Sequence, residues 1–292
     1  MRSRRVRASE ASSVTIQVQF WGVRGSIPSP GPETARIGGN TSCVEVRCGT
    51  TRIGFDAGTG LRLLGKDLAT SMPTTFHLFF SHVHWDHIQG FPFFVPAFVP
   101  GNTIHMYGAR SYMGTVETAM AGQMEFPNFP VVFDELPSAQ VFHDIQAGQI
   151  IEIGTGIEVR SVAGRHPGGV MIYRVDYEGR SVVYATDTEY ETSADVDESF
   201  LELCRGADVL IFDSMYTPDE YYGRVAPPSR VGWGHSTYQV GAEIAAKAQV
   251  GRYVLFHHDP DQDDDAVMAK ETAAREIFPA SQAAYEGLVL EL

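Results

Sequence analysis

Three histidines and one aspartate lie within six residues directly after an apolar stretch, and this feature limits the possible folds most strongly. The apolar stretch, Phe76–Phe80, is typical of a buried strand. The polar residues that follow it are His82, His84, Asp86 and His87. A turn after a strand can direct several side chains to one point, and imidazoles and carboxylates are ligands for zinc and similar divalent ions. The spacing therefore suggests two metal ions, one bound by the first histidine pair and one by the Asp-His pair.

The same segment, Ser81–His87, resembles the signature of the metallo-β-lactamase superfamily of binuclear metal hydrolases. Residues 20–26 and 38–42, Phe-Trp-Gly-Val-Arg-Gly-Ser and Gly-Gly-Asn-Thr-Ser, look like its phosphodiesterase branch, which includes ribonuclease Z and class II cyclic-nucleotide phosphodiesterases. The resemblance extends from about Phe20 to the end of the chain. It implies an α/β fold, a four-layer αββα sandwich, and two divalent metal ions. Zn²⁺ is the first expectation for these ions, with Mn²⁺ or Fe²⁺ as alternatives.

The composition fits one large domain. The chain has 292 residues and a hydrophobic share of 43%, which suffices for a substantial core. We expect one hydrolase domain over residues 14–292. The arginine-rich residues 1–13 lack the apolar region of a secretory signal and are expected to form a disordered tail. No apolar run is long enough for a membrane span.

The net charge indicates which substrates to expect, and the cysteines indicate the cellular compartment. The formal net charge is −14, whereas proteins that grip long nucleic acids usually present a basic face. A small phosphodiester is therefore expected as the substrate, and long nucleic acid is not. The three cysteines form no Cys-x-x-Cys motif, which fits a reducing, cytoplasmic location. The oligomeric state is left open, with a homodimer as one possibility.

The resemblance assigns the remaining metal ligands. His166, which precedes a glycine pair closely, matches the third ligand of the first metal. Asp187 lies in Thr-Asp-Thr, similar to the family's Gly-Asp-Thr, and matches the carboxylate that bridges both metals. His257 matches a ligand of the second metal, with His258 kept as the alternative. Because neighbouring strand residues point to opposite faces, these two histidines should not bind the same ion.

Two further aspartates follow apolar strands, as Asp86 and Asp187 do, which suggests that strand ends converge on one polar site. We expect Asp56 to support the metal-binding turn without binding metal, or alternatively to cap the next helix. In ribonuclease Z a glutamate that helps the catalytic histidine lies three residues before the bridging aspartate, and here that position is Tyr184. Asp213 is therefore the candidate partner of the catalytic histidine.

The segment His235-Ser236-Thr237 resembles the His-Ser-Thr motif of the phosphodiesterase branch, in which the histidine binds the phosphate or protonates the leaving group. Ser236 and Gln239 have the spacing of a capping box, so His235 should lie just before a helix. A helix N-terminus favours an anion nearby. We therefore predict Asp86, His235 and Asp213 as catalytic residues.

Several local predictions remain open at this point. Arg24 and Asn40 either reach the site or serve as turn and surface residues. The aromatic segment Phe91–Val99 either walls a pocket or belongs to the core, and residues 91–137 are a possible lid. A helix is predicted over Tyr112–Met120. Short antiparallel strands are predicted over residues 141–145, 150–153 and 157–162.

The predicted reaction is hydrolysis of a phosphodiester in a small, nucleotide-like or cyclic-nucleotide substrate. Two divalent ions can lower the pKa of a shared water and neutralise phosphoryl charge. Hydrolysis of a carboxylic ester, lactone, thioester or lactam on the same metals is the alternative enzyme function. A nonhydrolytic sensor of the same fold is the alternative outside catalysis.

Overall fold

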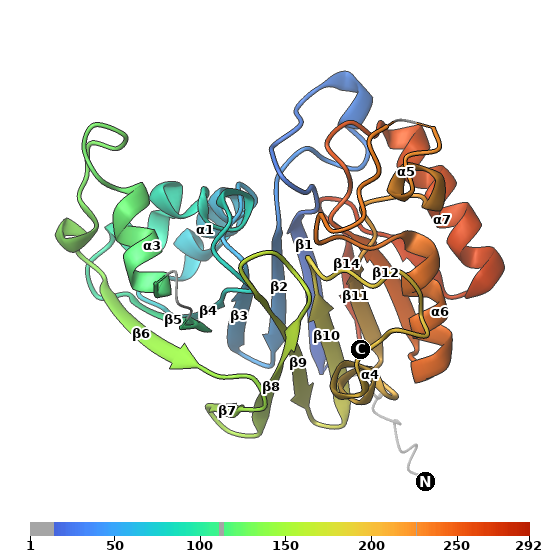
Figure 1. Ribbon diagram of the computed structural model, residues 1–292. Helices are drawn as coiled ribbons and strands as arrows, with labels where there is room; N and C mark the ends of the chain where they lie inside the picture. Colours follow the sequence, from blue (N-terminus) through green and yellow to red (C-terminus); the bar gives the residue numbers. More distant parts are fainter. Residues whose placement is uncertain (1–14, 111–113, 226) are drawn as a thin grey trace, which may run out of the picture.

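The fold consists of two facing seven-stranded mixed sheets with helices on both outer sides (Figure 1). The computed structural model describes residues 15–110, 114–225 and 227–292. The predicted tail at 1–13 lies outside the described residues, and so does Tyr112, the predicted start of a helix. The α/β fold class and the four-layer αββα sandwich are confirmed. Among the described residues, every helix is too short or too polar to cross a membrane.

The strands of the first sheet, in spatial order, are β14 (Val289–Glu291), β1 (Ile16–Gly22), β2 (Cys43–Cys48), β3 (Thr51–Phe55), β4 (Thr75–Phe79), β5 (Thr103–Ala109) and β6 (Ala139–Ile145). Those of the second sheet are β13 (Ser281–Ala283), β12 (Arg252–Phe256), β11 (Val209–Asp213), β10 (Arg180–Ala185), β9 (Val170–Tyr177), β8 (Ile157–Gly164) and β7 (Ile150–Ile153). The α-helices are α1 (Leu61–Leu68), α2 (Trp85–Ile88), α3 (Val116–Gln123), α4 (Glu198–Cys204), α5 (Pro218–Tyr221), α6 (Tyr238–Ala248) and α7 (Asp264–Ile277). Short 3₁₀ helices cover η1 (Pro32–Thr34), η2 (Ala69–Ser71), η3 (Phe91–Phe93), η4 (Val95–Phe98) and η5 (Phe133–Glu135).

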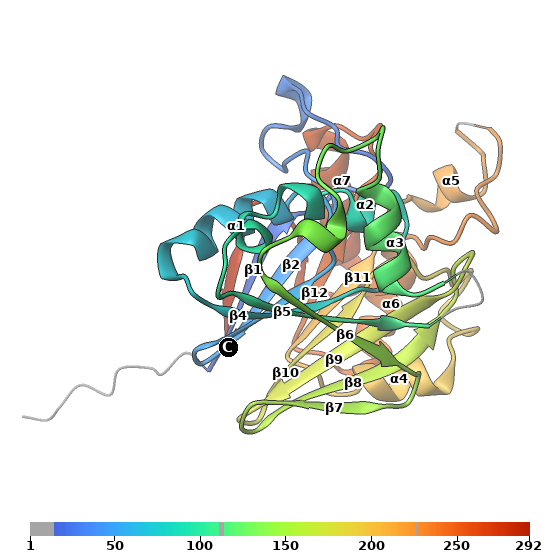
Figure 2. The ribbon, with the colours of Figure 1, turned by 90° about the vertical axis from the view of Figure 1, so that its left-hand side faces the viewer.

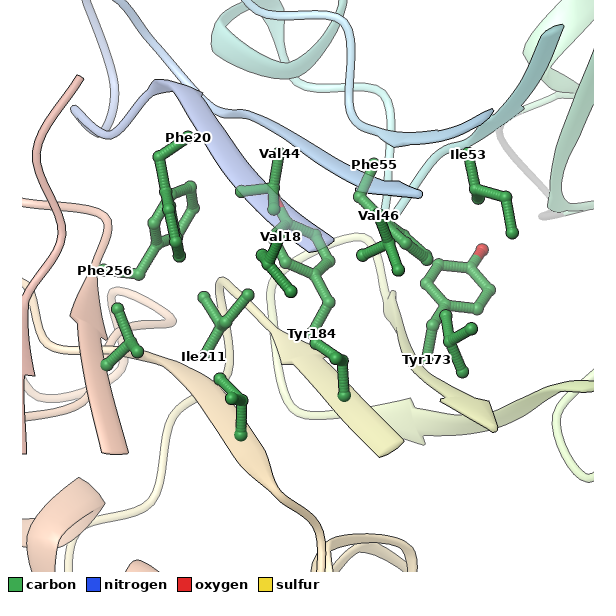
Figure 3. Packing of buried hydrophobic residues seen from close by; sticks show 14 of the residues in the cluster. Val18, Phe20, Val44, Val46, Ile53, Phe55, Tyr173, Tyr184, Ile211 and Phe256 are labelled. Atoms are coloured by element: carbon green, nitrogen blue, oxygen red, sulfur yellow. The ribbon is translucent and has the colours of Figure 1, made fainter. Parts of the chain in front are cut away.

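The main core lies between the two sheets, where apolar side chains of both sheets interdigitate (Figure 3). Its centre is aromatic. The ring of Phe55 on β3 lies 5.7 Å from that of Tyr173 on β9 and 5.3 Å from that of Tyr184 on β10, measured between centroids. Such pairs add to the stabilisation from area burial. They fix the two sheets relative to each other directly beneath the strand ends.

Both outer faces of the sandwich are covered. Phe91 and Phe94 are buried in the cluster between the first sheet and α1 and α3, so this part of the aromatic segment is core. On the second sheet, α4 and α6 bury apolar residues such as Phe200 and Ile244. The possible lid at 91–137 stays a prediction.

The direction of β6 differs from the prediction. Residues 139–145 pair in parallel with β5 in the first sheet, whereas β7 and β8 pair antiparallel in the second sheet. The helix α3 lies between β5 and β6 in the chain, and a connection of that length lets a chain return to the same end of a sheet. Figure 2 shows β4, β5 and β6 side by side in this arrangement.

Parallel strands bring chemically important residues to one edge of the sandwich. β3 and β4 run in parallel in the first sheet, and β10, β11 and β12 do so in the second. The carboxyl ends of parallel strands meet at the same edge of a sheet, and ligands bind outside those ends in open α/β sheets. Asp56, the turn 82–87, Asp187, Asp213 and His257 lie at or just after the ends of these five strands, whereas His166 follows β8 and His235 precedes α6.

Replacing Phe55 by alanine should lower the free energy of unfolding by about 3–5 kcal/mol, because it removes a buried ring between the sheets and leaves a cavity. Urea denaturation measures this change. The control is Ile150→Ala on β7, since Ile150 is 57% exposed and its loss should change the free energy by less than about 0.5 kcal/mol. Equal effects of the two substitutions would contradict the role given to the aromatic centre.

Candidate metal centre

Three site residues lie one or two positions after strands and adopt the left-handed backbone conformation. The φ angles are 61° for Asp56 after β3, 49° for Asp187 after β10 and 59° for His257 after β12. This conformation is uncommon for residues other than glycine, and it clusters at functional sites. It turns each side chain away from the strand's alternating pattern and toward the edge where the two sheets meet.

The first ligand group contains three histidines. Nδ1 of His84 lies 2.9 Å from Nε2 of His82 and 3.1 Å from Nε2 of His166. Oδ2 of Asp187 lies 3.7 Å from His82 Nε2 and 3.8 Å from His166 Nε2. A tetrahedral zinc site with bonds near 2.1 Å has ligand atoms about 3.4 Å apart. The three histidine nitrogens therefore have the spacing of one metal site, and Oδ2 of Asp187 lies beside two of them.

The second ligand group is buried and contains two carboxylates. Oδ2 of Asp86 lies 3.1 Å from Nε2 of His87 and 3.2 Å from Nε2 of His257. Oδ1 of Asp187 lies 3.3 Å from the same nitrogen of His87 and 3.2 Å from that of His257. These four residues also match the spacing of a metal site. The two oxygens of Asp187 thus face different ligand groups.

An unsatisfied buried nitrogen supports a cation in the second group. Nε2 of His87 is buried and forms no hydrogen bond with the described residues, although two carboxylate oxygens lie within 3.3 Å. Buried polar atoms without partners are rare, and buried charges are paired or coordinate metals. A divalent ion between these atoms would satisfy all of them. The residues present therefore fit a pair of metal ions.

The electrostatics of the two groups differ. Burial lowers the pKa of His82, His84 and His166, so these imidazoles are neutral at pH 7, the form that binds metal. In the second group burial alone would lower the pKa of His87, but Asp86, Asp187 and other carboxylates raise it well above its usual value. The proton on His87 thus balances the charge of these carboxylates. Cations bound there would take over this role.

Contacts behind the ligands hold their orientation. Asp56 is buried, and its Oδ2 lies 2.8 Å from Nδ1 of His87. The same oxygen accepts hydrogen bonds from the hydroxyls of Ser81 at 2.8 Å and Tyr184 at 2.7 Å. His166 Nδ1 lies 2.9 Å from the carbonyl oxygen of Gly234. Such contacts fix the tautomer and the ring orientation of metal-binding histidines.

His235 lies beside the two ligand groups and is paired with Asp213. Its Nδ1 lies 2.8 Å from Oδ2 of Asp213 at the end of β11. Burial lowers the pKa of His235, but the charge and hydrogen bond of Asp213 outweigh burial and raise the pKa to about 9. Because Nδ1 is engaged, Nε2 is the nitrogen that can serve a substrate.

The family follows from comparison with known proteins. A family model described as a beta-lactamase superfamily domain matches residues 51–258. The chain belongs to the metallo-β-lactamase superfamily. The solved structure of the metallo-β-lactamase fold protein YhfI from Bacillus subtilis is similar, with a TM-score of 0.71 at 20% identity over 95% of this chain and 99% of that one. This likeness shows the fold.

Curated relatives named ribonuclease Z also match. One from Prochlorococcus marinus is 34% identical over 165 residues, which are 54% of this chain and 45% of the relative. The match therefore spans less than half of that relative's length. Another, from Bacillus subtilis, is 25% identical over 260 residues, which are 72% of this chain and 79% of the relative.

Several sequence-based alternatives are decided by the geometry. His257 points into the second ligand group, whereas Nε2 of His258 lies 3.0 Å from the carbonyl oxygen of Ala284, away from it. Arg24 does not reach the ligand groups; its buried guanidinium donates to backbone carbonyls, including that of Gln262 at 2.6 Å. The side chain of Asn40 donates to Glu286.

The predicted capping box at Ser236 is wrong by one residue. Thr237 is the N-cap of α6, and its hydroxyl accepts a hydrogen bond from the backbone of Val240. The Ser236 hydroxyl instead donates to the carbonyl oxygen of Thr188, in the loop after Asp187, at 2.6 Å. Ser236 thereby ties the His235 segment to the segment that carries the central carboxylate.

Two contacts at this site were not among the sequence-based predictions. The backbone N–H of Ser26 donates to Oδ2 of Asp86 at 2.8 Å. Gly25 lies against the ring of His257, and a Cβ atom built there would be only 2.5 Å from Nδ1 of that ring. The one available signal was that both residues belong to the segment 20–26, on which the family resemblance partly rested.

Replacing Gly25 by alanine should displace the His257 ring, because a methyl group cannot fit at that distance. We expect a fall of about 10-fold or more in metal affinity, comparable to losing a supporting contact. Competition with a chromogenic chelator measures the affinity. Gly122→Ala is the control, since nothing lies within 4 Å of its Cβ position. Unchanged affinity in Gly25→Ala would contradict His257 as a ligand.

Proposed function

We propose that the chain is a binuclear metal-dependent phosphodiesterase. His82, His84 and His166 would hold the first ion, and Asp86, His87 and His257 the second, with Asp187 between them. The observation that carries this proposal is the position of Asp187, whose two oxygens face two separate ligand groups. Zn²⁺ is the metal that we propose first, because imidazole and carboxylate ligands in tetrahedral spacing suit it.

Two divalent ions bound there would lower the pKa of a water molecule and neutralise charge on a phosphoryl group. The protein residues around them divide the remaining tasks. Asp86 would hold the second ion together with His87 and His257, and the backbone N–H of Ser26 keeps its carboxylate in place. His235 carries a proton on Nε2 for the departing alcohol oxygen, while Asp213 fixes Nδ1–H and keeps the ring protonated.

We propose a small phosphodiester as the substrate class, with a nucleotide-like or cyclic-nucleotide compound as the finer expectation. The net charge of −14 supports this class, because a long polyanion would be repelled unless a local basic surface compensated. Relatives are named ribonuclease Z, so structured RNA is the competing substrate in any assay. The three cysteines are free and buried, which supports the proposed cytoplasmic location.

Metal analysis tests the proposed centre. Purified protein loaded with Zn²⁺ should contain close to two zinc ions per chain, measured by inductively coupled plasma mass spectrometry. Asp187→Ala should lose at least one ion and nearly all diesterase activity, because both groups lose a ligand. Asp219→Ala is the control, since this carboxylate is exposed and pairs with Arg224. Full activity of metal-free protein would refute the proposal.

Substrates with different leaving groups can show whether His235 donates a proton or only binds the phosphate. With a dinucleoside phosphate, His235→Ala should lower turnover by about 10²–10⁴-fold, the range for general acid catalysis. With bis(p-nitrophenyl) phosphate the loss should be far smaller, because nitrophenolate leaves without a proton. Metal content should stay near two ions. Equal losses on both substrates would contradict the acid role.

The pH dependence tests the pairing with Asp213. His235 acts as an acid only while protonated, so wild-type activity on the dinucleoside phosphate should fall as the pH rises through the pKa of His235. Asp213→Asn removes the charge that raises this pKa. The alkaline limb of the rate profile should therefore move to lower pH by about one unit or more. An unmoved limb would exclude Asp213 as the partner.

A further inference from the structure

A cleft opens beside His235, next to the proposed metal centre but separate from its ligands. Its volume is about 390 Å³, within the range in which proteins bind small molecules. Its walls include His235, Tyr216, Arg230, Trp233, Asp259 and Asp261. None of these residues belongs to the two ligand groups. We call this space the leaving-group cleft.

The cleft carries an aromatic surface. Trp233 is 52% exposed, although large aromatic side chains usually bury most of their area. The guanidinium carbon of Arg230 lies 5.3 Å from the ring centroid of Tyr216 and 6.0 Å from that of Trp233. Arginine at these distances attracts the ring faces. Tyr216 is buried, so Trp233 is the ring of this pair that offers an exposed face to the cleft. Exposed aromatic faces stack flat π systems, including nucleobases.

The position of Trp233 is fixed by its own loop. The carboxylate of Glu189 accepts hydrogen bonds at 2.6 Å from the backbone N–H of Gly232 and from that of Gly234, the residues on either side of Trp233. The hydroxyl of Tyr221 also donates to this carboxylate. The backbone N–H of Trp233 donates to the carbonyl oxygen of Arg230. A half-exposed tryptophan on an anchored backbone is a preformed contact surface.

The charges of the cleft give no net attraction for an anionic occupant. Its lining holds the carboxylates of Asp259 and Asp261, the guanidinium of Arg230 and the ring of His235, which is protonated in the proposed mechanism, so two negative groups balance two positive ones. A second phosphate group placed there would gain no net positive charge from the lining. A neutral ring system with N–H donors would meet acceptors instead. The occupant that fits is therefore an uncharged, flat, polar group.

The location relative to His235 decides which part of a substrate enters. His235 is the proposed proton donor, and it forms part of the cleft wall. The oxygen that receives its proton must lie within hydrogen-bond reach of its ring, and that oxygen belongs to the departing alcohol. The cleft beside His235 is the adjoining space that can receive the remainder of that alcohol.

We propose that the leaving-group cleft binds the nucleobase of the released nucleoside, stacked on Trp233. This inference rests on the proposed phosphodiesterase function and names its substrate class: phosphodiesters whose departing alcohol is a nucleoside. In the reaction the oxygen of water bonds to phosphorus, the bond between phosphorus and the nucleoside oxygen breaks, and the His235 proton goes to that oxygen. The remaining alcohol stays esterified to phosphate.

A substrate with two different alcohols tests this directly. In 2′-deoxyadenosine 5′-methyl phosphate, hydrolysis releases either deoxyadenosine with methyl phosphate or methanol with deoxyadenosine monophosphate. Chromatography measures the ratio of deoxyadenosine to the nucleotide. We expect the wild-type, metal-loaded protein to release mainly deoxyadenosine, because the base in the cleft places its oxygen beside His235. A ratio within one reaction is independent of folded fraction and metal content.

Variants of the aromatic surface should change this ratio. Trp233→Ala should lower it about tenfold, the order of effect that loss of one base-stacking contact produces. Trp233→Phe should keep it within about threefold, because a stacking ring remains. Tyr285→Ala is the control, since Tyr285 is a partly exposed aromatic residue that is not part of the cleft wall. The control should leave the ratio unchanged.

The outcomes separate this inference from the proposed function. Hydrolysis of bis(p-nitrophenyl) phosphate by the wild type tests the diesterase activity alone, and its absence would overturn both proposals. If that diester is cleaved but the deoxyadenosine diester is not, the nucleoside class is wrong. An equal release of both alcohols by the wild type, or a ratio unchanged in Trp233→Ala, would overturn the cleft assignment while the diesterase function stands.

Discussion

Two buried carboxylates of like charge share a space a few ångströms wide, and the rest of the site depends on how that charge is balanced. Oδ1 of Asp187 and Oδ2 of Asp86 both lie close to Nε2 of His87. Burial disfavours their ionised forms, yet the neighbouring histidines hold the pKa of each carboxylate well below its usual value. The negative charge of such a group needs a balancing positive charge, either a proton on His87 or cations bound between the oxygens and the imidazole nitrogens. The proposed pair of ions accounts for that balance.

The sandwich supplies the geometry that this balance requires. Asp56, Asp187 and His257 each leave a buried strand in the left-handed conformation, which costs free energy at each position. The strands themselves are locked by the aromatic centre around Phe55, so the strand ends cannot relax separately. The packing of the aromatic centre therefore maintains the strained backbone conformations at the strand ends. The same rigidity keeps Asp213 aligned with His235 and brings the cleft beside Trp233 to the metal centre.

The sequence predicted contacts within one segment better than contacts between segments. His82, His84, Asp86 and His87 fall within a single turn, so their spacing alone indicated a shared site. His166, Asp187 and His257 needed the family resemblance, because their approach depends on how distant strand ends converge. Residue alternation predicted that His257 and His258 point to opposite faces, but it could not tell which of them points into the site. In the structure His257 does so, and its backbone has a positive φ. The contacts of Gly25, Ser26 and Tyr184 cross between segments more than 55 residues apart in the chain, and nothing local in the sequence marks them.

The central claim is that two cations lie on either side of the Asp187 carboxylate. An anomalous-difference map from crystals of the Zn²⁺-loaded protein, collected at the zinc absorption edge, measures this directly. The account predicts two peaks about 3.5–4 Å apart, one among His82, His84 and His166 and the other among Asp86, His87 and His257. A single peak, or peaks only outside these side chains, would contradict it.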